Sequence, residues 1–419
     1  MTGVERYDTI RGAKEMIRLL HCSDLHLGVE NYGRLDPKTG LSTRLGDFLR
    51  SFDAIVDYAL GEDIELVLFC GDAYKTRDPN PTYQREFAKR IRRLSKANIP
   101  VFLLTGNHDL PLATGKANTM EILDTLDVPN VVVANTLATH VVETRGGKVQ
   151  IVALPWPVRS HLVTKEEYRK QSLEEINRLI GDAIEDLVNE EIETLDPKRP
   201  AILAAHATVF GATYGSERSV MLGQEVVIPS AVVTNPVFDY VALGHIHKHQ
   251  VLRNANPPVV YAGSLERIDF GEEKEEKGFV VVRLSKGNAE FEFMPLQVRA
   301  FLTIEVEARG DDPTAQVLEA IAAHEIEDRV VRLIIHTTAD KEPLLNDTEI
   351  LKALRDAFYV AAVNKDVERS IRLRLGERNY EEMTPRQVLR KYLQVKQVPG
   401  QRAEVLLKYA DELFPELDG

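Results

Sequence analysis

Five short motifs along this 419-residue chain carry side chains of the kinds that bind divalent metal ions. They combine carboxylates, a carboxamide and imidazoles without any thiolate, which suits Mn, Fe, Zn or Co better than Ca and argues against a structural zinc finger. The candidate ligands are Asp24, His26, Asp72, Asn107, His206, His245 and His247. Seven ligands are too many for one tetrahedral ion. They suit two ions that share a bridging carboxylate and keep positions open for water and substrate.

The spacing within the motifs supports a shared site. In Asp24-Leu25-His26 and His245-Ile246-His247, alternate side chains lie on one face of an extended backbone, so each pair can bind one metal or the same metal pair. Glycines precede Asp72, Asn107 and His245, where they suit tight turns at strand ends. A single Asp-x-His or a single histidine is usually structural. The five motifs together favour a functional metal site.

The elements that must position these motifs are short apolar strands. Ile17–Cys22, Leu66–Cys70 and Val101–Leu104 each end at a motif, and helical patterns over Thr43–Leu60 and Pro81–Leu94 separate them. This alternation predicts a parallel sheet, in which chemistry collects at the carboxyl ends of the strands.

The rest of the chain predicts further layers. From Val131 the pattern changes to short strands, a charged helix at about 165–193 and more strands, so we expect an α/β sandwich of two sheets flanked by helices. A second β-α-β-α-β alternation predicts a small α/β domain. The expected boundaries are residues 1–15 for an N-terminal extension, 16–298 for the large domain, 299–378 for the small domain and 379–419 for a helical tail.

The tail predicts two short amphipathic helices. Thr384 and Gln387 form a capping box, with Pro385 at the first helical position. The apolar stripes comprise Val388, Leu389, Tyr392, Leu393, Leu406, Tyr409 and Leu413. Such helices either pack on their own domain or dock on a partner helix.

Composition sets limits on location and partners. The net charge of −13 argues, as an average, against a nucleic-acid binder, but bound divalent metals would change the local field. The apolar runs are far too short to span a membrane, and the first residues lack the apolar region of a secretion signal. Cys22 and Cys70 fit reduced core thiols in a cytoplasmic protein.

The motif order D-x-H, G-D, G-N-H-D, H and G-H-x-H resembles that of the calcineurin-like metallophosphoesterases. The flanking sequences Leu20–Gly28, Gly215–Arg218 and Tyr261–Glu272 narrow the resemblance to the SbcD/meiotic-recombination-eleven family of DNA double-strand-break repair nucleases, prokaryotic type. It covers about residues 16–295. The small domain and the tail match the family's layout of a capping domain and an ATPase-binding tail.

The resemblance implies a role for each motif residue. Asp24, His26 and His247 would bind one metal, Asn107, His206 and His245 the other, and Asp72 would bridge them. His108 would protonate or stabilise the departing oxygen. Asp109 would either orient His108 or cap a turn.

The resemblance also implies an activity and partners. It implies a Mn-dependent nuclease, a 3′-to-5′ exonuclease on double strands and an endonuclease on single strands and hairpins. The nuclease would be cytoplasmic and nucleoid-associated, and would bind an SMC-like ATPase of SbcC type through the tail. It would pair as a homodimer through helices within Pro81–Leu94 and Ala117–Leu126. Lys75, Arg77 and Lys248 are candidate DNA contacts. Lys75 is a departure, because family members often carry His or Asp there.

Two alternatives remain open. The chain could be another calcineurin-like phosphodiesterase with a small-molecule substrate, although serine/threonine phosphatases carry Asp-Arg-Gly and a Glu where this chain has Ala73-Tyr74-Lys75 and Asp109. It could also be a non-catalytic scaffold, but such members usually lose a ligand or the catalytic histidine, and none is missing here.

Overall fold

The computed structural model describes residues 16–111, 116–162, 172–215, 226–368, 384–396 and 398–413. It divides into two compact units. The first comprises Met1–Ile304, His324–Leu333 and Leu354–Val363, and the second comprises the remaining residues. The expected N-terminal extension, residues 1–15, lies outside the described residues, as do Ser216–Arg218 of the flanking sequences. Within the described residues, no helix has the length and apolar character needed to cross a membrane.

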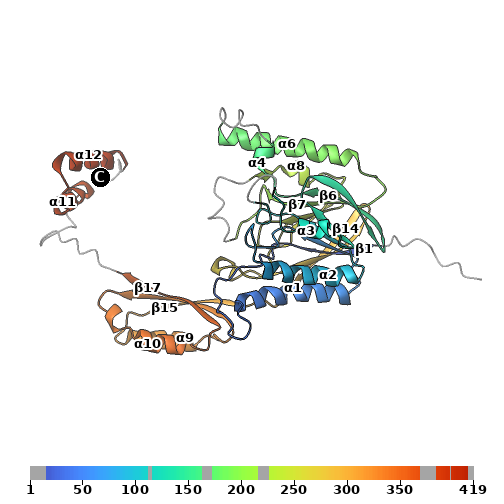
Figure 1. The fold of residues 1–419 in the computed structure, drawn as a ribbon. Helices are drawn as coiled ribbons and strands as arrows, with labels where there is room; N and C mark the ends of the chain where they lie inside the picture. Colours follow the sequence, from blue (N-terminus) through green and yellow to red (C-terminus); the bar gives the residue numbers. More distant parts are fainter. Residues whose placement is uncertain are drawn as a thin grey trace, which may run out of the picture. The chain divides into compact units, whose positions relative to one another are not determined.

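The first sheet of the large unit has the strand order β14-β13-β1-β2-β3-β4 (Figure 1). Its strands are β14 (Asn288–Pro295), β13 (Gly278–Ser285), β1 (Ile17–Cys22), β2 (Leu66–Cys70), β3 (Val101–Leu104) and β4 (Val131–Ala134). Strands β1 to β4 are parallel, and β13 is antiparallel to β1. The parallel strands therefore all direct their carboxyl ends to one edge.

The second sheet has the order β11-β12-β10-β7-β6-β5. Its strands are β11 (Gln250–Arg253), β12 (Val259–Tyr261), β10 (Tyr240–Gly244), β7 (Ala201–His206), β6 (Gly147–Leu154) and β5 (Ala138–Thr144). The four strands β6, β7, β10 and β12 are parallel. The short elements around this sheet are α4 (Arg159–Leu162), β8 (Thr208–Val209) and β9 (Val227–Ile228), whereas α3 (Glu121–Thr125) contacts β4 of the first sheet.

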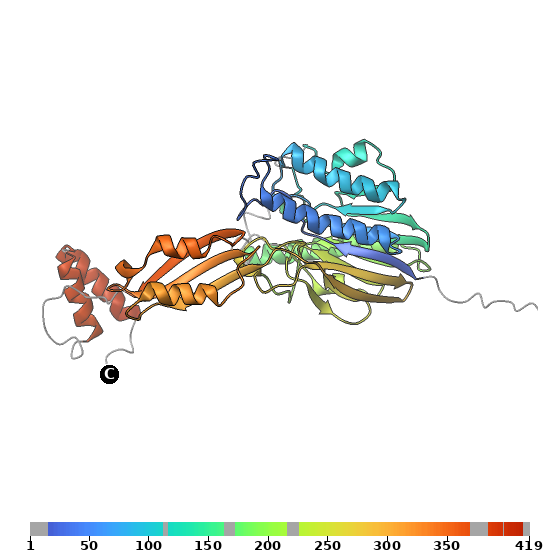
Figure 2. The same ribbon diagram turned by 90° about the horizontal axis from the view of Figure 1, so that it is seen from below.

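Three apolar cores hold the layers together. Residues such as Leu68, Tyr240 and Val282 are buried between the two sheets. Helices α1 (Thr43–Gly61) and α2 (Pro81–Lys96) cover the outer face of the first sheet (Figure 2). Helices α6 (Leu173–Glu193) and α8 (Ser230–Val233) cover the outer face of the second. The predicted two-sheet α/β sandwich is confirmed.

A third, three-stranded sheet has the order β15-β16-β17. Its strands are β15 (Phe301–Glu307), β16 (Val330–Thr338) and β17 (Tyr359–Glu368), and helices α9 (Pro313–Ala322) and α10 (Asp347–Ala353) pack against each other. The predicted β-α-β-α-β alternation is therefore present.

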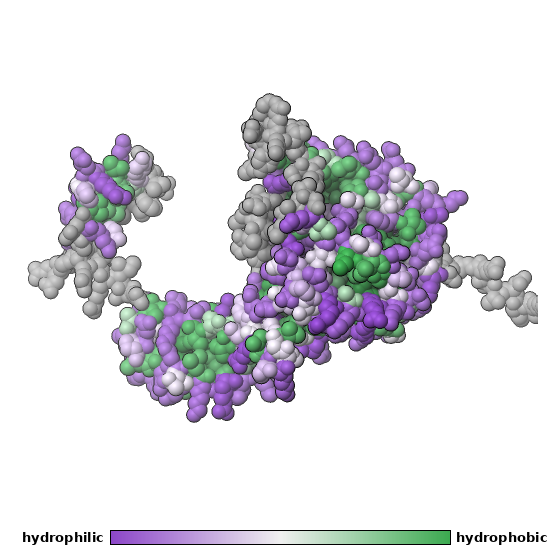
Figure 3. Space-filling model, viewed as in Figure 1, coloured by the Kyte–Doolittle hydropathy of each residue, from purple (hydrophilic) through white to green (hydrophobic). Residues whose placement is uncertain are grey.

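The tail forms two helices, α11 (Pro385–Val395) and α12 (Gly400–Leu413), which contact each other. The predicted capping box between Thr384 and Gln387 is formed at the start of α11. Leu393 and Leu407 are buried, whereas Tyr392, Leu406 and Tyr409 are exposed. Hydrophobic atoms are visible on the surface of this helix pair in Figure 3.

Candidate metal centre

The seven candidate ligands lie at the carboxyl ends of parallel strands from both sheets. Asp24 and His26 follow β1, Asp72 follows β2, Asn107 follows β3, His206 ends β7, and His245 and His247 follow β10. Asn107 and His247 are half-buried, and the other five are buried. Contacts of β2 with β7 and β10 bring the two sets of strand ends together.

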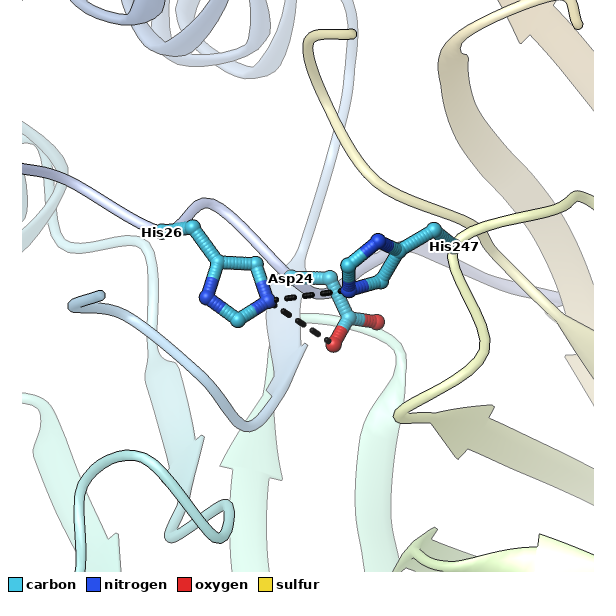
Figure 4. Close-up of side chains that lie close together, drawn as sticks. All are labelled: Asp24, His26 and His247. Atoms are coloured by element: carbon cyan, nitrogen blue, oxygen red, sulfur yellow. Dashed lines mark hydrogen bonds and ion pairs between the residues drawn. The ribbon is translucent and has the colours of Figure 1, made fainter. Parts of the chain in front are cut away.

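One group of ligands consists of Asp24, His26 and His247 (Figure 4). The Nε2 atoms of His26 and His247 are 3.0 Å apart. His26 Nε2 lies 3.9 Å from Asp24 Oδ1. All three side chains therefore point one potential ligand atom into a common space.

A second group forms around Asn107. Its Oδ1 lies 3.1 Å from Nε2 of His206 and 3.2 Å from Nδ1 of His245. Asp72 lies between the groups, because its Oδ2 is 3.6 Å from Nε2 of His26 and 3.4 Å from Nε2 of His206. One carboxylate oxygen thus faces both sets of ligands, as a bridging ligand requires.

These distances fit divalent ions. Ligands bound at about 2.0–2.2 Å to one ion lie about 3–3.5 Å from each other, which is close to the separations found here. Neutral Nε2 atoms of His26 and His247 that both present lone pairs would repel at 3.0 Å, whereas a cation between them would attract both. The carboxylate, carboxamide and imidazole set also suits transition ions.

The backbone at the ligands is left-handed rather than extended. The φ angles are +53° at Asp24, +48° at His26, +59° at Asp72 and +96° at His245. The extended backbone expected for the Asp24-x-His26 motif is therefore wrong. Such conformations cost about 1–3 kcal/mol each and occur at functional sites where the surroundings enforce them.

Backbone hydrogen bonds enforce these turns. The amide of Asp24 donates to the carbonyl of Gly71 at 3.0 Å, and that of His26 donates to the carbonyl of Asp72 at 3.0 Å. The amide of His245 donates to the carboxylate of Asp24 at 3.0 Å. The ligand-bearing loops of the two sheets are therefore tied directly to one another.

The carboxylate of Asp109 caps the turns that contain Asp72 and Gly106. Its carboxylate accepts hydrogen bonds from the amides of Asp72 at 2.7 Å, Ala73 at 3.0 Å and Gly106 at 3.0 Å. Burial, followed by the nearby charge of Asp72, raises its pKa to about 7. Of the two roles left open by the sequence, turn capping is the one found.

The ring of His108 is held by the carbonyl of Lys75 and not by Asp109. That carbonyl accepts from His108 Nδ1 at 2.8 Å, and the His108 amide donates to Asp72 Oδ1 at 2.9 Å. The ring centroid of His108 lies 5.0 Å from that of His26. His108 is therefore fixed beside the ligand cluster.

Close approach explains all three motif glycines, including Gly244, at which a Cβ would collide with the carbonyl oxygen of Cys70. Gly71 has a φ of +91°, and a Cβ there would collide with the His206 ring. A Cβ at Gly106 would collide with the carboxylate and amide of Asp72. Gly71 is thus needed for both its conformation and its size, and Gly106 for its size.

A family model described as "Calcineurin-like phosphoesterase" matches residues 17–249, the segment that contains all seven ligands and His108. The chain belongs to the calcineurin-like phosphoesterases. Members of this superfamily use divalent metal ions, which agrees with the three carboxylate-imidazole groups of this phosphoesterase.

Similar proteins indicate which members of the superfamily this phosphoesterase resembles. It is 25% identical over 352 residues to the DNA double-strand break repair protein Mre11 of Haloferax volcanii, covering 83% of this chain and 67% of that protein. The Mre11 of Thermoplasma acidophilum is 24% identical over 340 residues, 78% and 79% of the two chains. The SbcD component of the nuclease SbcCD of Escherichia coli is 26% identical over 283 residues, 65% and 66% of the two chains. These relatives confirm the predicted resemblance to the SbcD/meiotic-recombination-eleven family.

Burial and neighbouring charges together set the pKa values of the side chains in the phosphoesterase centre. Burial disfavours the imidazolium of His206, but Asp72, Asp24 and the carbonyl of Cys70 together outweigh burial and raise the His206 pKa to about 9. Burial also opposes ionisation of Asp72, yet His206 and His26 hold its pKa well below the usual value. Burial lowers the pKa values of His26 and His245. These shifts favour the carboxylate of Asp72 and the neutral imidazoles of His26 and His245, which are the forms that bind metal, whereas His206 must lose a proton to bind one.

The candidate DNA contacts lie around the centre. Lys75 is half-buried beside His108, Arg77 is exposed two residues further on, and Lys248 is exposed directly after His247. All three belong to loops that carry the metal motifs.

Two residues beside the ligands were not predicted. Glu272 accepts a hydrogen bond from Nδ1 of His247 at 2.8 Å, and Trp156 places its ring 4.7 Å from that of His245. Glu272 is the last residue of the flanking sequence Tyr261–Glu272, so the sequence analysis included this residue but gave it no role. Trp156 is the only tryptophan in the chain and follows strand β6, but no motif marks it.

Proposed function

We propose that this phosphoesterase is a Mn-dependent DNA nuclease and the nuclease subunit of an SbcCD-type DNA repair complex. The observation that carries the proposal is the convergence of seven ligands and His108 at the strand ends of both sheets. The names of the relatives, DNA double-strand break repair protein Mre11 and nuclease SbcCD, favour DNA as the substrate. The proposed activities are 3′-to-5′ exonuclease on double strands and endonuclease on single strands and hairpins.

The geometry of the side chains supports the roles that we propose for them. Asp24, His26 and His247 would hold one ion, Asn107, His206 and His245 would hold the other, and Asp72 would be a ligand of both. Divalent ions bound there would neutralise the phosphodiester charge and activate water near neutral pH.

His108 acts on the leaving group. Its Nδ1–H donates to the Lys75 carbonyl, so Nε2 is the nitrogen left to act on the substrate, and it gives a proton to the departing oxygen from the doubly protonated imidazolium, which becomes neutral in that step. Because the His108 amide donates a hydrogen bond to Asp72 Oδ1, the loop that carries the ring is tied to the loop that carries the proposed bridging ligand. The histidine thus keeps its position while substrate enters.

The surrounding cations position the DNA. Lys75, Arg77 and Lys248 follow metal motifs in sequence, and contacts with phosphates give affinity without sequence preference. Lys75 supplies a cation where the family often carries His or Asp. This difference affects the balance of exonuclease and endonuclease activity.

Two protein contacts complete the proposal. An SMC-like ATPase of SbcC type binds the tail helices, whose exposed apolar residues include Tyr392, Leu406 and Tyr409. A second copy pairs through α2 and α3, where Ile122 and Leu126 are 55% and 67% exposed. The complex works in the cytoplasm, associated with the nucleoid.

The test is cleavage by the purified protein. With Mn²⁺, the wild type should degrade a linear duplex and open a hairpin, because both substrates present phosphodiesters to the same centre. His108→Ala should slow cleavage by about 10²- to 10⁴-fold while its Mn²⁺ content stays unchanged, because His108 moves a proton and is no ligand. DNA that stays intact with Mn²⁺, Zn²⁺, Co²⁺ and Mg²⁺ while a small phosphodiester is cleaved would support a small-molecule phosphodiesterase instead.

A further inference from the structure

A buried ion pair lies behind His247, on the side away from the ligand cluster. Nδ1 of His247 is 2.8 Å from Glu272 Oε1, while its Nε2 faces His26. The other carboxylate oxygen, Oε2, lies 2.9 Å from Nζ of Lys277. Glu272 is 0% exposed and Lys277 is 1% exposed. Each charge compensates the other, which makes the burial of both tolerable.

The same pair holds the backbone on both sides. Lys277 Nζ donates to the carbonyl of His247 at 3.1 Å and contacts Glu275 at 2.8 Å. Glu272 Oε2 also accepts from the amide of Ile268 at 3.0 Å. The ring and the backbone of His247 are therefore fixed by the loop that spans residues 268–277.

The rings of the other ligands are held differently. Nδ1 of His206 is held by the carbonyl of Cys70 at 2.7 Å, and Nδ1 of His26 is buried without a hydrogen-bond partner among the described residues. A carboxylate behind a ligand imidazole fixes the tautomer with Nδ1 protonated and makes Nε2 a stronger donor to a metal. Of these three rings, His247 alone receives this support.

We propose that Glu272, held by Lys277, is a positioning residue that selectively strengthens metal binding at the Asp24–His26–His247 position. The two metal positions then differ in affinity, because the Asn107–His206–His245 position has no contact with this pair among the hydrogen bonds of the described residues. This inference rests on the ligand assignment made above. It does not depend on DNA being the substrate.

The test is titration of the metal-free full-length protein with Mn²⁺ alone. Calorimetry should resolve two binding steps in the wild type, and electron paramagnetic resonance should show a spin-coupled Mn²⁺ pair at saturation. Glu272→Gln keeps an acceptor but removes the charge, so it should weaken one step by about 10- to 100-fold and leave the other within a factor of two to three.

Glu275→Gln is the matched control, because the Glu275 carboxylate also lies 2.8 Å from Lys277 Nζ but does not hold the His247 ring. The Glu275→Gln variant should retain both Mn²⁺-binding steps.

Unchanged binding steps in Glu272→Gln, or equal weakening of both steps, would overturn the proposal. If Glu272→Gln fails to fold by circular dichroism, Glu272→Asp keeps the charge but shortens the reach to His247. The same selective loss is then expected, and its absence overturns the proposal. A protein that binds Mn²⁺ as described but spares DNA would refute only the nuclease function.

Discussion

At the scale of single residues, the metal centre depends on Asp109, a carboxylate that is not one of the proposed ligands. Oδ2 of Asp109 accepts from the amides of Asp72 and Gly106, and Oδ1 accepts from that of Ala73. In Asp109→Asn one oxygen becomes an NH₂ group, which leaves at least one buried amide without an acceptor. We expect a loss of about 1–3 kcal/mol of unfolding free energy for each such amide, measured by urea denaturation.

The exposed Asp356→Asn is the control, and its stability should match the wild type. The capping role of Asp109 is contradicted if the two variants unfold at the same urea concentration.

The sequence predicted which side chains gather at the centre better than it predicted the residues that support them. The motifs named the side chains that the structure brings together, because ligand chemistry restricts residue types at fixed local spacing. The bond from His247 to Glu272 joins positions 25 residues apart, and no local pattern specifies such a contact. The left-handed backbone of Asp24 and His26 was missed for a related reason, since hydrogen bonds to the neighbouring loop at residues 71–72 impose it.

At the scale of elements, a buried charge network fixes helix α1 to the segment before β15. Asp47 is 1% exposed and lies 2.6 Å from Arg44 and 2.7 Å from Arg299. Burial opposes its ionisation, but Arg299 and Arg44 hold its pKa below the usual value. A carboxyl with a depressed pKa stabilises the fold above its unfolded pKa of about 3.9, and this contribution is lost as pH falls through the folded value.

Asp47→Asn removes the buried carboxylate that Arg44 and Arg299 share, although Arg299 still pairs with Asp328 and Arg44 lies 4.0 Å from Glu266, so we expect a loss of about 3 kcal/mol at pH 7. The difference from wild type should shrink as the pH falls below about 4, because the unfolded carboxyl then binds a proton, and it should disappear only once the native carboxyl is protonated at its lower pKa. Urea denaturation at pH 7 and pH 3 measures both. Asp57→Asn, on the same helix, breaks an exposed pair with Arg93 and should cost at most about 1 kcal/mol. A difference in unfolding free energy between Asp47→Asn and the wild type that does not change with pH would contradict the depressed pKa of Asp47.

The elements that sequence patterns predicted best are those buried on both faces. Strands β1, β2 and β3 are almost wholly buried and end at motifs, so apolar runs marked them clearly. Strand β14 was not predicted, because exposed and half-buried residues alternate along it and it is ordered by pairing with β13. The expected helical segment Ala117–Leu126 contains a helix only over Glu121–Thr125.

At the scale of the whole molecule, local pairing decides which positive charges are available. The basic stretch Arg85–Arg93 is largely neutralised, since Arg85 and Lys89 pair with Glu86, and Arg90 and Arg93 pair with Asp53 of α1. Helix α2 is therefore a poor DNA surface despite its composition. Together with the net charge of −13, this pairing concentrates the proposed DNA contacts at the motif loops.

The tail is the surface proposed to join this chain to its ATPase. Leu407 is buried within the helix pair, while Leu406 and Tyr409 are 40% and 59% exposed, so the latter two can be changed without disturbing the pair. We expect Leu406→Glu/Tyr409→Glu to weaken binding of the SbcC-type subunit by more than about 30-fold, because interface anchors contribute about 2 kcal/mol or more. Gln401→Glu, an exposed change on the same helix, should bind normally.

Sedimentation measures the assembly without and with the ATPase subunit. Both variants alone should sediment as homodimers, because α2 and α3 are untouched, and only the Gln401→Glu protein should shift when the ATPase is added. Monomers at micromolar concentration would refute pairing through α2 and α3. A normal shift of the double variant would show that the exposed stripe is not the binding surface, and the contact with the ATPase would then have to lie outside the exposed face of α12.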